Sequence, residues 1–237
     1  MTRRRWIADE VSGNRAALVG EHAEHLSRVL RAQVGQQFDI ATDANVRQGR
    51  ITSVAPGRVE FELGQEIPAR ETPKIILLLS VFKFDRMEWA IEKCTELGAA
   101  RIVPVIAERT EAHLAVAAPK RLERWQRIAL QASEQSRRIA PPEITHPVAV
   151  TEAAGMPGGT RILLSEVERE VTVRDILSSR PSDNGVLLAF GPEGGWTETE
   201  LTLFREAGWQ SASLGDTILR CETAAIAAMA LAVAELR

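Results

Sequence analysis

Apolar and polar positions follow one pattern in the first 70 residues of the chain and a different pattern after them. Residues 37–41, 49–54 and 58–63 alternate apolar with polar side chains, and turn-forming residues separate them. Alternation of this kind predicts short strands with one buried face. A short stretch, residues 21–31, has apolar positions at helical spacing. Several short strands in succession predict a small β-barrel.

From about residue 71 onward, continuous apolar runs alternate with amphipathic stretches. The apolar runs predict strands buried on both faces of a sheet, at residues 75–81, 101–107 and 161–165. Helical spacing predicts helices at residues 85–97 and from Leu122 to about Arg138. This alternation predicts an α/β domain in which a parallel sheet carries helices on both faces. The proline-bracketed segment 68–73 predicts a semi-rigid linker between the two regions.

Near the end of the chain, an apolar run stops at a glycine-rich loop and a helix begins. Val186 to Phe190 predicts a buried strand, and Gly191-Pro192-Glu193-Gly194-Gly195 follows it. Thr197 and Glu200 then stand at the spacing of a capping box, in which each side chain satisfies a free amide of a helix start. The loop is therefore predicted to lie between a strand end and a helix N-terminus.

A second unit of the same design follows at once. Residues 209–214 predict a strand, Gly215-Asp216 a turn and residues 221–236 an alanine-rich helix. Ligands of open α/β sheets bind at the carboxyl ends of the strands, where loops diverge and amides point outward. Both loops are therefore candidates for a binding site. Two ordinary tight strand-to-helix turns are the alternative interpretation.

The first loop does not have the composition of a phosphate-binding loop. A Walker loop needs Lys followed by Ser or Thr after its last glycine, and Trp196-Thr197 stands there. Glu193 also places a negative charge where a phosphate would lie. A neutral or cationic ligand is therefore favoured over a nucleotide tail.

Composition and charge narrow the class of protein. The 237 residues are 45% hydrophobic and 26% charged, as in a globular protein with a core, and the net charge is −3. That charge argues against a surface coated with positive charge for nucleic acid, so any RNA binding must be local. Residues 120–138 hold six basic residues against two acidic ones. A basic RNA-binding face and an ordinary solvated helix face are both compatible with this cluster.

Cysteine usage and terminal sequence predict a protein without metal or membrane anchor. Cys94 and Cys221 are solitary and form no metal-type pair, so buried free thiols are expected and no metal site is. No apolar stretch approaches the roughly 20 residues that cross a bilayer. The basic start MTRRRWIADE has no apolar segment behind it. A cytoplasmic protein is expected.

The two glycine units carry a specific resemblance. GPEGGWTETE at residues 191–200 and SLGDTILRCETAA at residues 213–225 resemble the signature of the SPOUT methyltransferases. They closely resemble those of the RsmE family, whose members methylate N3 of a specific uridine in 16S ribosomal RNA. Further segments agree with that family: RRRW at 3–6, HLSRVLR at 25–31, KFDRMEWAIEKCTELG at 83–98, ERT at 108–110 and EQSRR at 134–138. The chain departs from the family near Asp216-Thr217, where a basic residue is frequent, and near Arg137, where a glycine is.

The resemblance implies a fold, a cofactor and partners. It implies a PUA-like RNA-binding β-barrel over residues 1–70 and a SPOUT domain with a deep C-terminal trefoil knot over residues 71–237. The knot would be one of the rare exceptions to unknotted topology. S-adenosylmethionine is the implied cofactor, and 16S ribosomal RNA, within the small ribosomal subunit, is the implied substrate. A homodimer is implied too, and the thin alanine face of the last helix suits its interface; packing of that face inside its own subunit is the alternative.

Site residues follow from the resemblance position by position. The implied cofactor-binding residues are Leu163, Leu164, Ser165, Gly191, Glu193, Gly194, Gly195, Leu214, Gly215, Ile218, Leu219, Arg220, Thr223 and Ala224. The candidate catalytic residues are Arg220, Glu193, Arg109 and Arg137, with Arg109 and Arg137 reaching in from a partner subunit. The candidate RNA-binding residues are Arg3, Arg4, Arg5, Arg28, Arg31, Lys83, Arg86 and Arg138. No residue is an obvious base for the N3 proton, each arginine could instead form a structural ion pair, and Glu193 could instead orient its loop. Trp6 is expected to plug the barrel rather than to stack on a base.

Three other functions stay open at this stage. A SPOUT enzyme acting on transfer RNA or on a ribose oxygen is the first, although the domain order and the segments at 83–98 and 134–138 count against it. A nicotinamide-dependent oxidoreductase is the second, and it lacks the G-x-G-x-x-G motif with a later acidic residue. A non-catalytic RNA-binding module is the third.

Overall fold

The computed structural model describes residues 5–42, 45–68, 73–179 and 185–236. Contacts divide the chain into two compact units, residues 1–71 with 133–140 and residues 72–132 with 141–237. The sequence predicts the first boundary in the same part of the chain. It assigns residues 133–140 to the second domain, whereas the structure groups them with the first unit.

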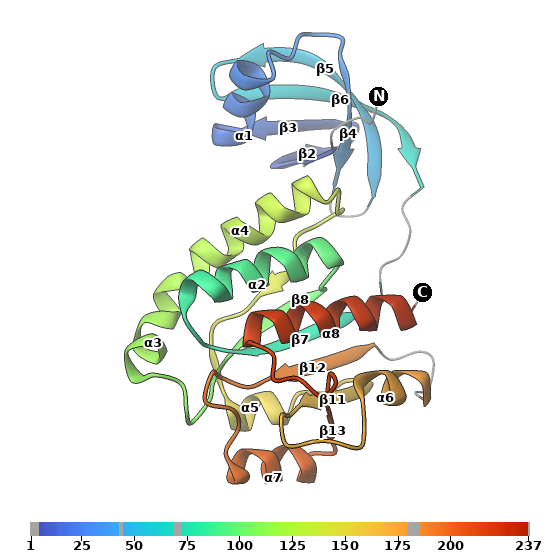
Figure 1. Ribbon diagram of the computed structural model, residues 1–237. Coiled ribbons are helices and arrows are strands. Elements are labelled where there is room, and N and C mark those ends of the chain that lie inside the picture. The colour runs from blue at the N-terminus through green and yellow to red at the C-terminus, as the bar shows by residue number, and fades with distance from the viewer. Residues whose placement is uncertain (1–4, 43–44, 69–72, 180–184, 237) are drawn as a thin grey trace. The chain divides into compact units, whose positions relative to one another are not determined.

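The first unit is built on a mixed six-stranded sheet in the order β1-β4-β5-β6-β3-β2. Its strands are β1 (Arg5–Ile7), β2 (Glu10–Ser12), β3 (Arg15–Val19), β4 (Gln37–Ala41), β5 (Val46–Ala55) and β6 (Arg58–Ile67). The β1–β4 pair is parallel and the other pairs are antiparallel. The sheet curls into a half-barrel with β1 and β2 at its two edges (Figure 1).

The core of this half-barrel lies between the sheet and one short helical segment. Helix α1 (Gly20–Glu24) runs directly into a π-helical turn, His25–Val29, so the predicted helix over 21–31 is confirmed with an irregular second half. Leu18, Ile40 and Phe61 are fully or almost fully buried there. Trp6 is only 4% exposed among them, which confirms that its ring fills the core and is not free to stack on a base.

The end of helix α4 (Leu122–Gln135) belongs to this unit and meets it through a histidine. His22 Nδ1 lies 3.0 Å from Asp9 Oδ1, and His22 Nε2 lies 3.6 Å from Glu134 Oε1. The helix ends before the predicted Arg138 because Arg137 adopts φ 60°, which a right-handed helix cannot continue. A single imidazole therefore links two carboxylates from distant parts of the chain.

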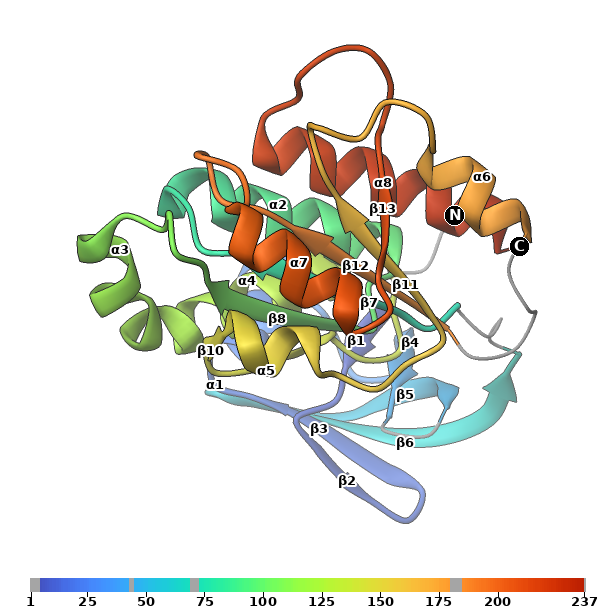
Figure 2. The same cartoon turned by 90° about the horizontal axis from the view of Figure 1, so that it is seen from below.

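The second unit contains a parallel sheet in the order β10-β8-β7-β12-β11-β13 (Figure 2). Strand β9 lies off this path and pairs with β8. The strands are β7 (Ile75–Ser80), β8 (Arg101–Ile106), β9 (Glu143–Ile144), β10 (Val148–Ala149), β11 (Thr160–Leu164), β12 (Val186–Phe190) and β13 (Gln210–Ala212). All pairs in it are parallel. The predicted parallel sheet is confirmed, and β12 is buried at every residue as its apolar run requires.

Helices cover both faces of this sheet, as predicted. Besides α4, they are α2 (Phe84–Leu97), α3 (Ala112–Ala117), the 3-10 turn Ala118–Arg121, α5 (Val150–Ala154), α6 (Val173–Ser179), α7 (Glu198–Glu206) and α8 (Cys221–Glu235). One core joins α2, α4, α6 and α8 to the sheet, and a second core joins α5 and α7 to the opposite face (Figures 1 and 2).

The spacing of apolar residues explains how these helices dock. Met87, Ile91 and Cys94 of α2 are fully buried, and Gly98 ends the helix at φ 106°, where glycine is favoured. Ala225 and Ala228 of α8 are also fully buried against the sheet and α2. These two alanines of α8 therefore pack inside their own subunit. Internal packing was one of the two interpretations of the alanine face, the other being a dimer interface.

The strand order brings the two glycine units together. β11 lies between β12 and β13 in the sheet. The chain that leaves β12 therefore forms α7 and then β13, which pairs with the far edge of the earlier strand β11. From β13 it returns to α8, which packs over β12 and β7. This is the kind of crossing that the predicted trefoil knot needs, and the knot itself stays a prediction.

The helices of the described residues were compared with the length and apolar character that a membrane span requires. No helix there is long and apolar enough to cross a membrane.

Candidate active site

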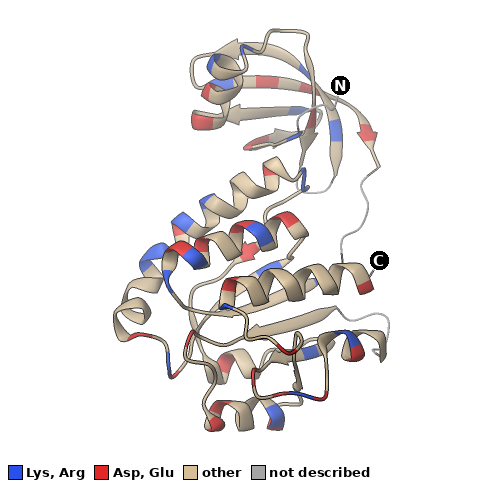
Figure 3. Ribbon diagram, in the orientation of Figure 1, with Lys and Arg blue, Asp and Glu red and all other residues tan. Residues whose placement is uncertain are grey.

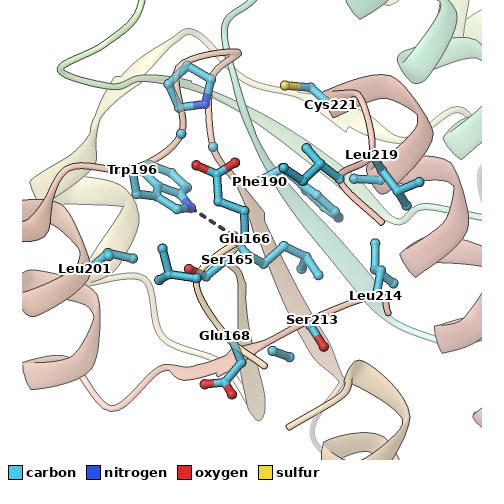
Figure 4. Close-up of a pocket in the computed structure, with 18 of the residues that line it drawn as sticks. Ser165, Glu166, Glu168, Phe190, Trp196, Leu201, Ser213, Leu214, Leu219 and Cys221 are labelled. Carbon is cyan, nitrogen blue, oxygen red and sulfur yellow. Dashed lines mark hydrogen bonds between the residues drawn. The ribbon is translucent and has the colours of Figure 1, made fainter. Parts of the chain in front are cut away.

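A cavity of about 240 Å³ opens where the carboxyl ends of β11, β12 and β13 meet, within the second unit. Its apolar walls come from Leu164 at the end of β11 and from three residues labelled in Figure 4: Phe190 at the end of β12, and Leu214 and Leu219 in the loop between β13 and α8. Charged side chains complete the lining: Arg109, Glu166, Glu168, Arg169 and Glu198. An apolar slot with a few polar groups is the usual composition of a cofactor site.

The glycine loop after β12 forms one wall and is held in a defined shape. The Gly195 N–H donates to the Pro192 carbonyl at 2.8 Å, and Gly195 adopts φ 69°, a conformation that disfavours side chains. Trp196 Nε1 donates to the Leu164 carbonyl at 3.1 Å, and the indole is buried. The loop is thereby tied to the end of β11.

A second tie comes from the segment after β8. Arg109 Nη1 donates to the Gly194 carbonyl at 2.7 Å and to the Trp196 carbonyl at 3.3 Å. An added Cβ on Gly194 would lie 3.4 Å from the Arg109 side chain. The family resemblance predicts that Arg109 reaches the site from a partner subunit. The structure instead has Arg109 lining the cavity of its own chain.

The helix after the loop starts with the predicted capping box, which extends to β8. The Thr197 side chain accepts from the Glu200 N–H, and Glu200 Oε2 accepts from the Thr197 N–H at 2.8 Å. Glu200 is buried, and its other oxygen accepts from the Glu108 N–H at 2.8 Å. Thr197 Oγ1 also donates to Glu108 Oε2 at 2.9 Å. The capping box is confirmed and has a long-range partner that spacing could not predict.

Glu193, at the tip of the glycine loop, faces two basic residues of the α2 start. Its carboxylate lies 3.5 Å from Arg86 Nη1 and 4.0 Å from Lys83 Nζ. Arg86 Nε also lies 3.9 Å from Glu222 Oε1, a carboxylate that is buried in the first turn of α8. Lys83 and Arg86, predicted to bind RNA, therefore also neutralise acidic groups at the edge of the site.

Nine of the fourteen predicted cofactor residues line the cavity: Leu164, Ser165, Gly191, Gly195, Leu214, Gly215, Ile218, Leu219 and Ala224. The other five, Leu163, Glu193, Gly194, Arg220 and Thr223, do not contribute to its lining. Leu163 faces the core on the opposite side of the sheet, because neighbouring side chains of a strand point to opposite faces. Arg220 is the N-cap residue of α8 and is exposed.

Sequence reasoning missed several lining residues, among them Glu166, Phe190, Trp196 and Cys221. Each is a neighbour of a predicted residue, and none belongs to a motif of its own. Burial raises the pKa of Cys221 to about 11, with further contributions from Glu193, Glu222 and Glu166. The thiol is therefore neutral at physiological pH and is no nucleophile. Among the described residues, no group of acidic, histidine or cysteine side chains is arranged to hold a metal ion.

The remaining predicted residues belong to the first unit. Arg5 Nη1 donates to the Arg137 carbonyl, and burial is the main cause that lowers the pKa of Arg5. Burial lowers the pKa of Arg138 to about 10. Arg28 and Arg31 are exposed. Arg3 and Arg4 lie outside the described residues.

Comparisons with known proteins agree with this fold and site. A family model described as an RNA methyltransferase domain matches residues 70–233, so the second unit is of that class. The chain is 34% identical over 212 residues to ribosomal RNA small subunit methyltransferase E of Synechocystis, covering 87% of this chain and 68% of the relative. It is 32% identical to the Bacillus subtilis protein of the same name, covering 90% and 87%.

A solved structure agrees over almost the whole chain. The ribosomal RNA small subunit methyltransferase E of Neisseria gonorrhoeae, bound to S-adenosylmethionine, has a TM-score of 0.84 and 32% identity. The match covers 97% of this chain and 96% of that one. The chain belongs to the ribosomal RNA small subunit methyltransferase E family, the RsmE family of the sequence resemblance.

Proposed function

We propose that this protein transfers a methyl group from S-adenosylmethionine to N3 of a specific uridine in 16S ribosomal RNA. The observation that carries the proposal is the cavity at the ends of β11, β12 and β13, in a chain that aligns along most of its length with ribosomal RNA methyltransferases. The cavity is the evidence for the assigned cofactor, and the relatives named as small subunit methyltransferases are the evidence for the assigned substrate.

The lining suits S-adenosylmethionine in shape and in charge. Leu164, Leu214 and Leu219 offer an apolar slot for the adenosine half. Gly195 gives the close approach, because an added Cβ there would lie 2.5 Å from Glu166 Oε1. The carboxylates in the lining suit a cationic group and oppose a phosphate. When bound, the cofactor supplies an activated methyl group on a cationic sulfur.

The residues of the chain must orient uracil N3 in line with that methyl group and manage the N3 proton. Arg220, exposed beside the cavity-lining Leu219 and Cys221, is suited to stabilise the uracil anion. Glu193 is the candidate to accept the proton or to orient the loop, and its carboxylate lies 4.0 Å from Lys83 Nζ and 3.5 Å from Arg86 Nη1. Arg109 is bound to loop carbonyls and is better suited to position the loop.

RNA binding is assigned to exposed basic residues of both units. In the first unit Arg28 and Arg31 are exposed, while Arg5 and Arg138 are partly buried. Arg3, Arg4 and Arg137 complete the basic set of that unit, with Arg137 also a candidate for the uracil anion. Two arginines of the basic cluster, Arg121 at the end of the 3-10 turn and Arg124 in α4, lie 3.8 Å and 2.6 Å from Glu88, which reduces the charge they offer to phosphate. We propose further that the protein acts as a homodimer in the cytoplasm. Its substrate is then the ribosomal RNA within the small ribosomal subunit.

Methyl transfer to defined RNA substrates tests the proposal. The purified protein is incubated with labelled S-adenosylmethionine and, separately, small-subunit particles, naked 16S ribosomal RNA and transfer RNA. Nucleoside mass spectrometry should find 3-methyluridine in ribosomal RNA, and cells lacking the protein should lose it. Label in transfer RNA alone, or on a ribose oxygen, would reject the assigned substrate.

A further inference from the structure

Glu166 is the feature of the cavity that neither the motifs nor the reaction chemistry explains. It follows the end of β11, two residues beyond Leu164, and its side chain projects into the cavity (Figure 4). One carboxylate oxygen lies where a Cβ on Gly195 would come within 2.5 Å, so the carboxylate lies against the glycine loop. Its charge also acts on Cys221, at the start of α8. Glu166 therefore stands between three walls of the site.

Glu166 differs from the other acidic residues of the lining. Glu168 Oε1 accepts the backbone N–H groups of residues 169, 170 and 171 at 2.8–3.1 Å, so its charge is used within its own loop. Glu198 is the first residue of α7, where the helix dipole stabilises a negative charge. Within the described ranges of the chain, the Glu166 carboxylate has neither a hydrogen bond nor an ion pair. Glu198 shares this lack of a partner, but of these carboxylates it is that of Glu166 that lies against the glycine loop, beside Gly195.

Basic residues do not neutralise this position from nearby. The cationic side chains of the lining are Arg109 and Arg169, against the three carboxylates of Glu166, Glu168 and Glu198. Arg109 is engaged by two carbonyls of the glycine loop. A positive group in the cavity would therefore meet an excess of negative charge, to which Glu166 contributes.

We infer that Glu166 contacts the sulfonium of the cofactor and makes the site prefer S-adenosylmethionine over its product S-adenosylhomocysteine. This inference rests on the proposed function. The sulfonium joins the adenosine half to the amino-acid half, and Glu166 presents its carboxylate to the cavity beside the glycine loop, between the end of β11 and the start of α8 (Figure 4). Glu166 is then a specificity-determining residue.

The charge balance of the reaction gives this contact a consequence. In the transfer the N3–C bond would form as the C–S bond breaks, the N3 proton would pass to the acceptor, for which Glu193 is the candidate, and the positive charge on sulfur would be lost. The attraction to Glu166 is lost at that moment, so the product is held less tightly than the substrate. A contact with the ammonium of the amino-acid half would hold substrate and product equally.

Glu166→Gln tests the inference, because it keeps the shape of the side chain and removes its charge. Dissociation constants are measured by isothermal titration for S-adenosylmethionine, S-adenosylhomocysteine and 5′-methylthioadenosine, which lacks the amino-acid half. Glu166 is exposed to solvent, so its charge acts through a water-like dielectric. The affinity for S-adenosylmethionine should fall about fivefold, as expected for one charge pair about 4 Å apart in such a medium. The affinities for the two neutral thioethers should stay unchanged.

Matched variants separate a local contact from the general field of the protein. Glu206→Gln removes the same charge from an exposed residue at the end of α7, outside the cavity lining, and should leave all three affinities unchanged. Glu166→Asp keeps the charge on a shorter side chain and should restore part of the preference. Added salt should reduce the preference of the wild-type protein and have little effect on that of Glu166→Gln.

Other outcomes would overturn the inference. Equal losses for S-adenosylmethionine and S-adenosylhomocysteine would assign Glu166 to the ammonium, and no loss for either would remove it from recognition. A thermal melt of Glu166→Gln, expected to match the wild type, guards against a folding effect. Failure of the wild-type protein to bind S-adenosylmethionine would reject the proposed function, and this inference with it.

Discussion

Replacement of Glu200 by alanine should destabilise the second unit and weaken cofactor binding. Glu200 is 5% exposed, and its two carboxylate oxygens accept from the N–H groups of Glu108 and Thr197, each at 2.8 Å. The first bond joins α7 to the segment after β8, and the second closes the capping box. Glu200→Ala removes both acceptors and opens a small void behind the glycine loop.

The size of the effect follows from those two bonds. A capping residue contributes about 1 kcal/mol. A buried N–H that loses its acceptor costs roughly 1–3 kcal/mol. Their sum predicts a loss of about 3 kcal/mol in the free energy of unfolding, or roughly 6–12 °C in melting temperature for a protein of this size. Glu200→Gln keeps one acceptor oxygen and should cost about half as much.

Urea denaturation of the wild-type protein and the variants measures this loss. Glu206→Ala, at the exposed end of the same helix, is the control and should stay within about 0.5 kcal/mol of the wild type. Isothermal titration should show weaker binding of S-adenosylmethionine by Glu200→Ala, because Thr197 directly follows the cavity-lining Trp196. A variant that unfolds within about 1 kcal/mol of the wild type would refute the assignment of Glu200 as a brace.

Three further predictions concern the glycine loop and the first unit. Gly195→Val should abolish cofactor binding while the fold persists, because Gly195 has φ 69° and a Cβ would enter the cavity beside a carboxylate; retained affinity in isothermal titration would contradict this. Trp196→Phe should weaken cofactor binding severalfold through loss of the indole bond to the Leu164 carbonyl, and an unchanged dissociation constant would exclude that bond as a support of the loop. His22 should make stability depend on pH: its hydrogen bond to Asp9 raises its pKa against the opposing effect of burial. Its contribution is therefore full below the unfolded pKa of about 6.5 and lost as pH rises through the folded value, so His22→Gln should destabilise more at about pH 6 than at about pH 9 in urea denaturation.

Local signals in the sequence were sufficient for the elements around the glycine loop. The apolar run of β12, the glycines after it and the capping box at Thr197 each depend on residues that are close in sequence. β2 and β3 were missed because their patterns are not those of half-buried strands. Every residue of β2 is exposed, and β3 buries three residues in succession. β3 pairs with β6 and β2 pairs with β3, and such pairing is not a local property of the sequence.

The site was predictable where a motif marked it and not where the topology made it. Gly191 and Gly195 belong to a recognisable loop, and both line the cavity. Glu166 belongs to no motif, and it meets Gly195 because β11 and β12 are neighbours in the sheet. Arg109 contacts Gly194 across 85 residues of sequence. Contacts of that range depend on the strand order, which periodicity along one chain does not specify.

The braces of the glycine loop suggest how affinity is divided between the two sides of the cavity. Trp196, Arg109 and Glu200 hold the loop from the end of β11, the segment after β8 and the start of α7. A wall fixed from three sides loses little conformational entropy when a ligand binds. The opposite wall, residues 214–219, has no hydrogen bond to the loop among the described residues, and Ile218 is 79% exposed. We therefore expect any adjustment to a bound cofactor to come from the side of α8, while the glycine loop keeps its position.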